Sequence, residues 1–110
     1  MTIANQITFT SKPDQERDLK TILNTLVTQA LLEKGCQKFE LYQLSESRQE
    51  FFIVEIWKSD KSYQTHLKQE AYKKLLRKIE DLCSTQIIHP LKLTQCLTKL
   101  GLKSKKEEKK

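Results

Sequence analysis

Residues 51–57 are apolar on both faces when they are read as a β-strand. One face carries Phe51, Ile53, Glu55 and Trp57, and the other carries Phe52, Val54 and Ile56. A strand of this kind needs cover on both sides of its sheet. Helices of the same chain can cover one side, but the sequence offers no obvious cover for the other. A second subunit is the simplest cover, and we therefore expect a homodimer.

The residues before this strand predict one strand and one helix. Residues 3–9 alternate, and one face carries Ile3, Asn5, Ile7 and Phe9. An amide on that apolar face must find a hydrogen-bond partner. The motif Ser11-Lys12-Pro13-Asp14 is typical of a helix start, and Gly35 is typical of a helix end. Between them an apolar stripe consists of Leu19, Ile22, Leu23, Leu26, Val27, Ala30 and Leu31.

The rest of the chain completes a six-element pattern. Residues 39–44 predict a strand, and the polar residues 45–50 predict a hairpin loop. After a capping Ser59, one helix or two abutting helices would bury Tyr63, Leu67, Ala71, Leu75, Ile79 and Leu82. A last strand over residues 86–94 contains Pro90, which predicts an edge strand or a bulge. The order βαββαβ indicates an α+β ferredoxin-like fold with an antiparallel sheet.

Charge and length limit the partners of this chain. Of the formal charge of +6, residues 99–110 contribute +4, in a segment without apolar periodicity. We expect residues 1–98 to form one domain and residues 99–110 to be a disordered basic tail. Without an aromatic platform, this tail does not predict nucleic-acid binding. No apolar run reaches about 18 residues, so we expect no membrane contact. The first residues lack the features of a signal peptide, which favours a cytoplasmic protein.

The cysteines and histidines predict neither a disulfide nor a metal site. Cys36, Cys83 and Cys96 are odd in number and far apart, so they form no disulfide framework and no CxxC metal pair. His66 and His89 are also distant in sequence. The chain has only two glycines, which excludes a glycine-rich phosphate loop. We therefore expect no metal and no nucleotide cofactor.

Three short motifs resemble the antibiotic biosynthesis monooxygenase family in their order and spacing. They are Gly35-Cys36 with Phe39-Glu40-Leu41-Tyr42, then Phe52 with Glu55-Ile56-Trp57-Lys58-Ser59, then His66-Leu67. The resemblance covers roughly residues 3–94. It implies a dimeric α+β barrel, in which two sheets pack face to face and each subunit keeps a pocket between its sheet and its helices. Members of the family include oxygenases that need no cofactor, haem-degrading enzymes, isomerases and binding proteins.

The haem-degrading branch of the family fits this chain only in part. Asn5 corresponds to the strand asparagine of that branch. His66 stands where the branch usually has tryptophan, and Leu76 stands where its iron-ligating histidine should be. We therefore expect no haem and no other cofactor.

Six residues are the candidate site. We expect His66 to be a catalytic base, since histidine titrates near neutral pH, and Asn5 to donate a hydrogen bond to a substrate oxygen. The expected pocket residues are Trp57, Tyr42, Glu55 and Tyr63. Each has a structural alternative. His66 could simply bond a neighbour, Asn5 could bridge strands or bind buried water, the aromatic residues could anchor the core or a dimer interface, and Glu55 could form an interstrand or intersubunit ion pair.

These features together predict a cofactor-independent monooxygenase that acts on a small aromatic or quinone-like metabolite. Its chemistry needs a base that makes an electron-rich anion, a donor that stabilises the anion, and aromatic walls that hold the substrate. One alternative is a non-catalytic ligand-binding or stress-response module of the same fold. A second alternative is an isomerase of a small metabolite. The lining of the pocket distinguishes these three functions.

Overall fold

The computed structural model describes residues 1–94, and these residues form the predicted βαββαβ fold. The elements are β1 (Ile3–Ser11), α1 (Glu16–Leu31), β2 (Cys36–Gln43), β3 (Glu50–Trp57), α2 (Asp60–Lys68), α3 (Glu70–Leu82) and β4 (Cys83–Leu91). The strands form one antiparallel sheet in the order β2-β3-β1-β4. The α+β ferredoxin-like prediction is therefore confirmed. The predicted tail, residues 99–110, lies outside the described residues.

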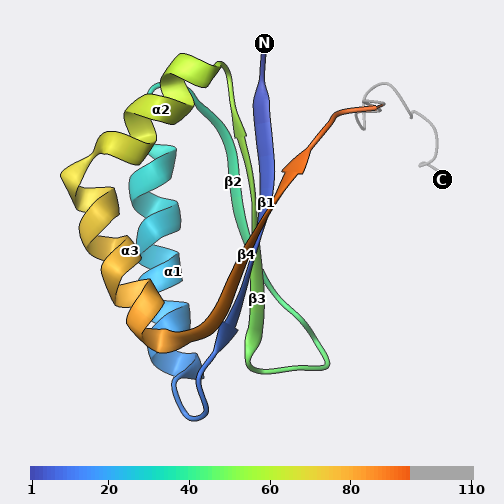
Figure 1. The fold of residues 1–110 in the computed structure, drawn as a ribbon, viewed down its shortest axis with the longest axis vertical. Helices are drawn as coiled ribbons and strands as arrows, with labels where there is room; N and C mark the ends of the chain where they lie inside the picture. The colour runs from blue at the N-terminus through green and yellow to red at the C-terminus, as the bar shows by residue number, and fades with distance from the viewer. Residues whose placement is uncertain (95–110) are drawn as a thin grey trace, which may run out of the picture.

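The helices all lie on one side of the sheet, as Figure 1 shows. Apolar side chains of α1, α3 and the inner face of the sheet form the core between the two layers. Its largest fully buried side chains are Leu19, Leu23, Phe51, Ile53, Trp57 and Ile79. The alternation predicted for residues 51–57 is confirmed, because every second residue of β3 is buried under the helices.

The other side of the sheet, here called the open face, has no cover within the described part of the chain (Figure 1). Of the two inner strands, β3 presents Phe52, Val54 and Ile56 to this face, and these residues are half-buried. Towards the edges, Tyr42 is 45% exposed, Ile87 50% and Leu91 42%. Apolar residues therefore remain on the face for which the sequence predicts a second subunit.

The first helix begins later than the sequence predicts. β1 continues through Ser11, whose N–H donates to the Gln49 carbonyl at 2.8 Å, and the N–H of Lys12 donates to the Leu82 carbonyl at 2.9 Å. Asp14 has a φ of 66°, which is left-handed and cannot belong to a helical turn. The predicted start at residues 11–14 is therefore wrong, because distant partners take the backbone donors of that segment.

Gly35 does not end the first helix, which stops at Leu31. Its carbonyl accepts a hydrogen bond from the Lys58 N–H at 2.9 Å. A Cβ at this position would overlap the Oγ and Cβ of Ser62, at the start of α2. Glycine is required here because the loop between α1 and β2 lies directly against α2.

The second helical region consists of two helices that abut at Gln69, as one of the alternatives predicts. The ψ of Gln69 is 135°, so the helical path breaks there. Because of this break, the side of α3 that faces the sheet does not continue the buried side of α2. Ala71, which the sequence predicts to be buried, is exposed, and Tyr72 is half-buried in its place. The predicted cap is confirmed, since Ser59 Oγ accepts from the Ser62 N–H at 3.1 Å.

The last strand is an edge strand, which agrees with the interpretation of Pro90. It spans Cys83–Leu91, about three residues earlier than residues 86–94. Within residues 1–94, no helix combines the length and the apolar character that crossing a membrane requires.

Candidate functional site

A cavity of about 240 Å³ lies between the sheet and the helices. Its polar lining comes from Glu55, His66, Tyr72, Glu80 and Gln86. Its apolar lining consists of Ile7, Phe9, Leu26, Phe39, Leu76, Ile79 and Ile88. No lysine or arginine of the described chain takes part in this lining. A mostly apolar cavity with a few convergent ionisable groups is typical of a site for small organic molecules.

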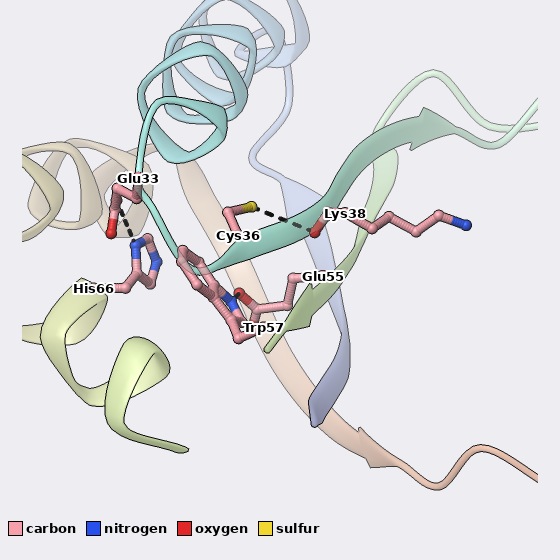
Figure 2. A network of polar contacts seen from close by, with 6 residues as sticks. All are labelled: Glu33, Cys36, Lys38, Glu55, Trp57 and His66. Carbon is pink, nitrogen blue, oxygen red and sulfur yellow. Dashed lines mark hydrogen bonds and ion pairs between the residues drawn. The ribbon is translucent and has the colours of Figure 1, made fainter. Parts of the chain in front are cut away.

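Glu55 is the most buried carboxylate in this site. It lies on β3 opposite Asn5 of β1, and it is 2% exposed. Its Oε2 accepts a hydrogen bond from Asn5 Nδ2 at 2.9 Å, and its Oε1 accepts one from Trp57 Nε1 at 2.8 Å. Figure 2 shows the Glu55 carboxylate beside the indole of Trp57. Both carboxylate oxygens thus accept from N–H donors, which satisfies the charged form in an apolar surrounding.

The partners of Glu55 correct one interpretation of this residue. An interstrand ion pair was one alternative, but the partners within residues 1–94 are an amide and an indole, both uncharged. The uncompensated charge acts on neighbouring groups. It contributes to raising the pKa values of Tyr63, Tyr72 and Cys36, although burial is the largest cause for each.

His66 stands on α2 among aromatic rings and is 2% exposed. Its ring centroid lies 4.5 Å from that of Trp57 and 4.3 Å from that of Tyr72. Its Nδ1 lies 2.8 Å from Glu33 Oε2, as Figure 2 shows. In the neutral ring, Nδ1–H therefore donates to this carboxylate, and Nε2 keeps a lone pair. Among the residues described, Nε2 has no hydrogen-bond partner. The arrangement can accept a proton at Nε2.

Tyr72 supplies a hydroxyl group to the same cavity. Burial, together with the negative charges of Glu55 and other neighbours, raises the pKa of Tyr72 to about 12. The phenol therefore keeps its proton at neutral pH and remains a hydrogen-bond donor. The sequence analysis missed Tyr72, because the helix break at Gln69 decides which side of α3 faces the sheet.

Only two of the six candidate residues line the cavity, three others lie beside them, and one lies on the other side of the sheet. His66 and Glu55 line the cavity, and Asn5 and Trp57 donate hydrogen bonds to the Glu55 carboxylate. Tyr63 is half-buried beside Trp57, with ring centroids 6.5 Å apart. Tyr42 lies on the open face.

Tyr42 is therefore not a wall of this cavity, and that expectation needs correction. Its hydroxyl donates to Glu40 Oε1 at 2.6 Å, and its ring stacks on Phe52 with centroids 4.9 Å apart. The alternation of β2 explains this position, because Phe39 is buried under the helices and a residue three positions later must point the other way. The alternative of an interface anchor stays a prediction.

The described residues contain no cluster of three or more potential metal ligands. Burial is the main cause that raises the pKa values of Cys36 and Cys83 to about 11, so neither is an activated thiol at neutral pH. Leu76 lines the cavity at the position that the resemblance assigns to the iron ligand of haem-degrading relatives. Its aliphatic side chain has no ligand atom, so the position does not fit haem binding of that kind.

The fold and the cavity define a small α+β domain with a histidine and a buried carboxylate between its sheet and its helices. The family model described as antibiotic biosynthesis monooxygenase matches residues 2–78. The chain belongs to this family. No protein of curated function matches the chain.

Solved structures share the fold at low sequence identity. PA3566 from Pseudomonas aeruginosa is 24% identical, with a TM-score of 0.80, and the match covers 86% of this chain and 95% of that one. Rv0793 from Mycobacterium tuberculosis is 19% identical, with a TM-score of 0.81 and coverage of 89% and 100%. A mutant form of SnoaB from Streptomyces nogalater, a cofactor-independent oxygenase, is 11% identical, with a TM-score of 0.79 and coverage of 87% and 96%. At these identities the likeness shows the fold alone.

Proposed function

We propose that this protein is a cofactor-independent monooxygenase of a small aromatic molecule that carries an acidic C–H or O–H group, such as an anthrone or a quinol. The observation that carries the proposal is His66, a buried histidine that lines a mostly apolar cavity and has one ring nitrogen at hydrogen-bond distance from a carboxylate. An apolar cavity of about 150 Å³ holds benzene. The cavity of about 240 Å³ is larger than this, so it has room for a substrate of more than one ring.

The proposed reaction begins with proton transfer from an activated methylene group to Nε2 of His66. The carbanion gives one electron to O₂, and the resulting radical and superoxide combine to form a C–O bond. The peroxide takes the proton back from the imidazolium. Loss of the remaining C–H proton then breaks the O–O bond and releases water. The balance is CH₂ + O₂ → C=O + H₂O, so O₂ is the only oxidant required.

The other residues of the site have distinct roles in this proposal. Tyr72 is a protonated phenol at the cavity and donates a hydrogen bond to the oxygen on which negative charge develops. Asn5 was expected to make that bond, but it does not line the cavity, and its Nδ2 donates to Glu55. In the revised role, Asn5 and Trp57 hold Glu55 in the wall of the cavity. Apolar side chains such as Phe39 and Leu76 exclude water from the reacting anion.

The proposal includes a homodimer that buries the open face. The family resemblance implies this assembly, and the exposed apolar side chains of Ile87 and Leu91 support it. The cavity lies on the opposite side of the sheet, between each sheet and its own helices. Each protomer would therefore carry a complete site.

Oxygen uptake with anthrone and 1,4-naphthalenediol tests the proposed function. We expect uptake above the spontaneous rate, and a loss of at least about 100-fold in His66→Gln, because a positioned base contributes that much. Gln64→Ala is the matched control, since Gln64 is exposed on the same helix as His66 and does not line the cavity. No enzyme-dependent uptake with either compound would contradict the oxygenase function.

Deuterium exchange separates the alternatives. In D₂O without oxygen, a base at the cavity exchanges the methylene protons of anthrone. Exchange without later oxygen uptake would favour the isomerase, which uses the same base. Binding without exchange would favour the non-catalytic module.

A further inference from the structure

Glu33 was not among the candidate residues, yet it is the hydrogen-bond partner of His66. It lies in the loop between α1 and β2, and its side chain is 14% exposed. The distance from Glu33 Oε2 to His66 Nδ1 is 2.8 Å. The two residues are 33 positions apart in the chain, so only the tertiary fold brings them together.

The loop that carries Glu33 is fixed by its backbone. The N–H of Glu33 donates to the Ala30 carbonyl at 3.0 Å, and the carbonyl of Glu33 accepts from the Cys36 N–H at 3.1 Å. The Lys58 N–H donates to the Gly35 carbonyl at 2.9 Å, which ties the loop to the end of β3. Gly35 also lies directly against Ser62 of α2, the helix that carries His66. The carboxylate is thus held near the imidazole before any substrate binds.

The remaining groups around His66 do not compete for its protons. Trp57, Tyr72 and Phe39 present ring systems to the imidazole. The ionisable groups near the ring are Glu55 on β3, Tyr63 on α2, Tyr72 and Glu80 on α3, and Cys36 on β2. Within residues 1–94, none of these groups forms a hydrogen bond with the imidazole. The Glu33 carboxylate therefore decides which ring nitrogen carries the proton.

We propose that Glu33 is the positioning residue of the proposed base, an inference that rests on the proposed function. Glu33 holds His66 as the Nδ1–H tautomer and so leaves the lone pair of Nε2 free at the cavity. When Nε2 takes a proton from the substrate, the carboxylate stabilises the imidazolium that forms. A carboxylate has this relation to a catalytic histidine in the serine-protease triad, where loss of the correct tautomer lowers kcat about 10⁴-fold.

Nitrogen NMR of the full chain tests the tautomer without any substrate. The chain contains only two histidines, so the long-range ¹H–¹⁵N spectrum is simple, and His89→Gln assigns it. At about pH 9, where an ordinary imidazole is neutral, we expect His66 as Nδ1–H. We expect His89, which has no carboxylate partner among residues 1–94, mainly as Nε2–H, the form that free imidazole prefers. An Nε2–H form or an imidazolium at His66 in the wild type would overturn the inference.

Variants at Glu33 link the tautomer to catalysis. In Glu33→Leu, which is similar in size but has no acceptor, we expect the His66 signals to move toward those of His89 and kcat to fall about 100-fold or more, with KM little changed. Glu33→Gln should also lower kcat and shift His66 toward the Nε2–H form, because the amide N–H can donate to Nδ1. Lys34→Leu, an exposed change in the same loop, is the control and should alter neither.

The two proposals fail separately in these experiments. Full oxygen uptake in Glu33→Leu, or an unchanged His66 spectrum in that variant, overturns the positioning role and leaves the oxygenase function standing. If the wild type has the Nδ1–H tautomer and loses it in Glu33→Leu but consumes no oxygen, the oxygenase function fails while the tautomer control by Glu33 is supported.

Discussion

Replacement of Gly35 by alanine should destabilise the protein and separate Glu33 from His66. The added Cβ would overlap Ser62 Oγ and Cβ, whereas it would be in ordinary contact with Ser62 Cα at 3.6 Å. Rotation of the hydroxyl cannot remove an overlap with Cβ. The loop and α2 must therefore move apart by roughly 1 Å, and overpacking of this kind costs about 1–3 kcal/mol.

The same movement would act on the histidine. The bond between Glu33 and His66 is 2.8 Å long, and it joins the two elements that must separate. A lengthening of about 1 Å exceeds the range of a hydrogen bond. We therefore expect Gly35→Ala to lose part of the Nδ1–H tautomer as well as stability, although neither atom of that bond is mutated.

A second substitution tests whether the close approach is the cause. Ser62→Gly removes both overlapping atoms and keeps the N–H that donates to Ser59 Oγ. Alone, it should cost about 1 kcal/mol, because glycine is unfavourable in a helix. In the double variant with Gly35→Ala, the alanine Cβ has space. The double variant should therefore be more stable than the sum of the single effects predicts.

Urea unfolding followed by Trp57 fluorescence measures these energies, since Trp57 is the only tryptophan and is 0% exposed. The protein concentration must be the same for all variants, because a dimer unfolds in a concentration-dependent way. Two results would refute the reasoning. One is a Gly35→Ala variant within about 0.5 kcal/mol of the wild type. The other is a double variant that shows only additive effects.

Three further predictions concern the carboxylate, the phenol and the open face. Trp57→Phe removes the donor to Glu55 Oε1 and should cost about 1–3 kcal/mol for the unsatisfied oxygen in addition to lost packing, measured by circular dichroism. The raised pKa of Tyr72 makes folding stability decrease as pH rises from about 10 to about 12, because the unfolded phenol ionises first; this group contributes about 2–3 kcal/mol. Tyr72→Phe should therefore show a shallower loss over that range than the wild type, and equal slopes would contradict the assignment. Val54→Lys places a charge at the centre of the open face, so sedimentation should find a dimer for the wild type and a monomer for the variant; a monomeric wild type at micromolar concentration would contradict the dimer.

The sequence predicted the layers of the fold from local periodicity. Alternation in residues 51–57 placed Glu55 and Trp57 on one face, and alternation in residues 3–9 placed Asn5 on the buried face of its strand. Their hydrogen bonds follow from neighbouring strands in register, with Asn5 opposite Glu55. The position of Tyr42 was also within reach, because the same alternation turns it away from Phe39.

Other features could not be predicted because they depend on distant partners. The late start of α1 results from bonds between Ser11 and Gln49 and between Lys12 and Leu82. The pair of Glu33 and His66 depends on the approach of Gly35 to α2, and no local signal in the sequence marks such an approach. The end of α2 at Lys68 allows α3 to close over His66 with Tyr72, and the stripe predicted from the sequence did not include Tyr72.

The charges of the site favour electron transfer in the proposed reaction. A substrate anion formed in the cavity would lie near Glu55, which has two N–H donors but no cationic partner among residues 1–94. Repulsion in a medium of low dielectric constant raises the energy of that anion, so loss of an electron to neutral O₂ becomes easier. The imidazolium of His66 is then the only positive charge close to the superoxide, because no lysine or arginine of the described residues lines the cavity. Glu33 therefore has to stabilise the imidazolium from the side away from the substrate, and the loop that is packed against α2 gives it that position.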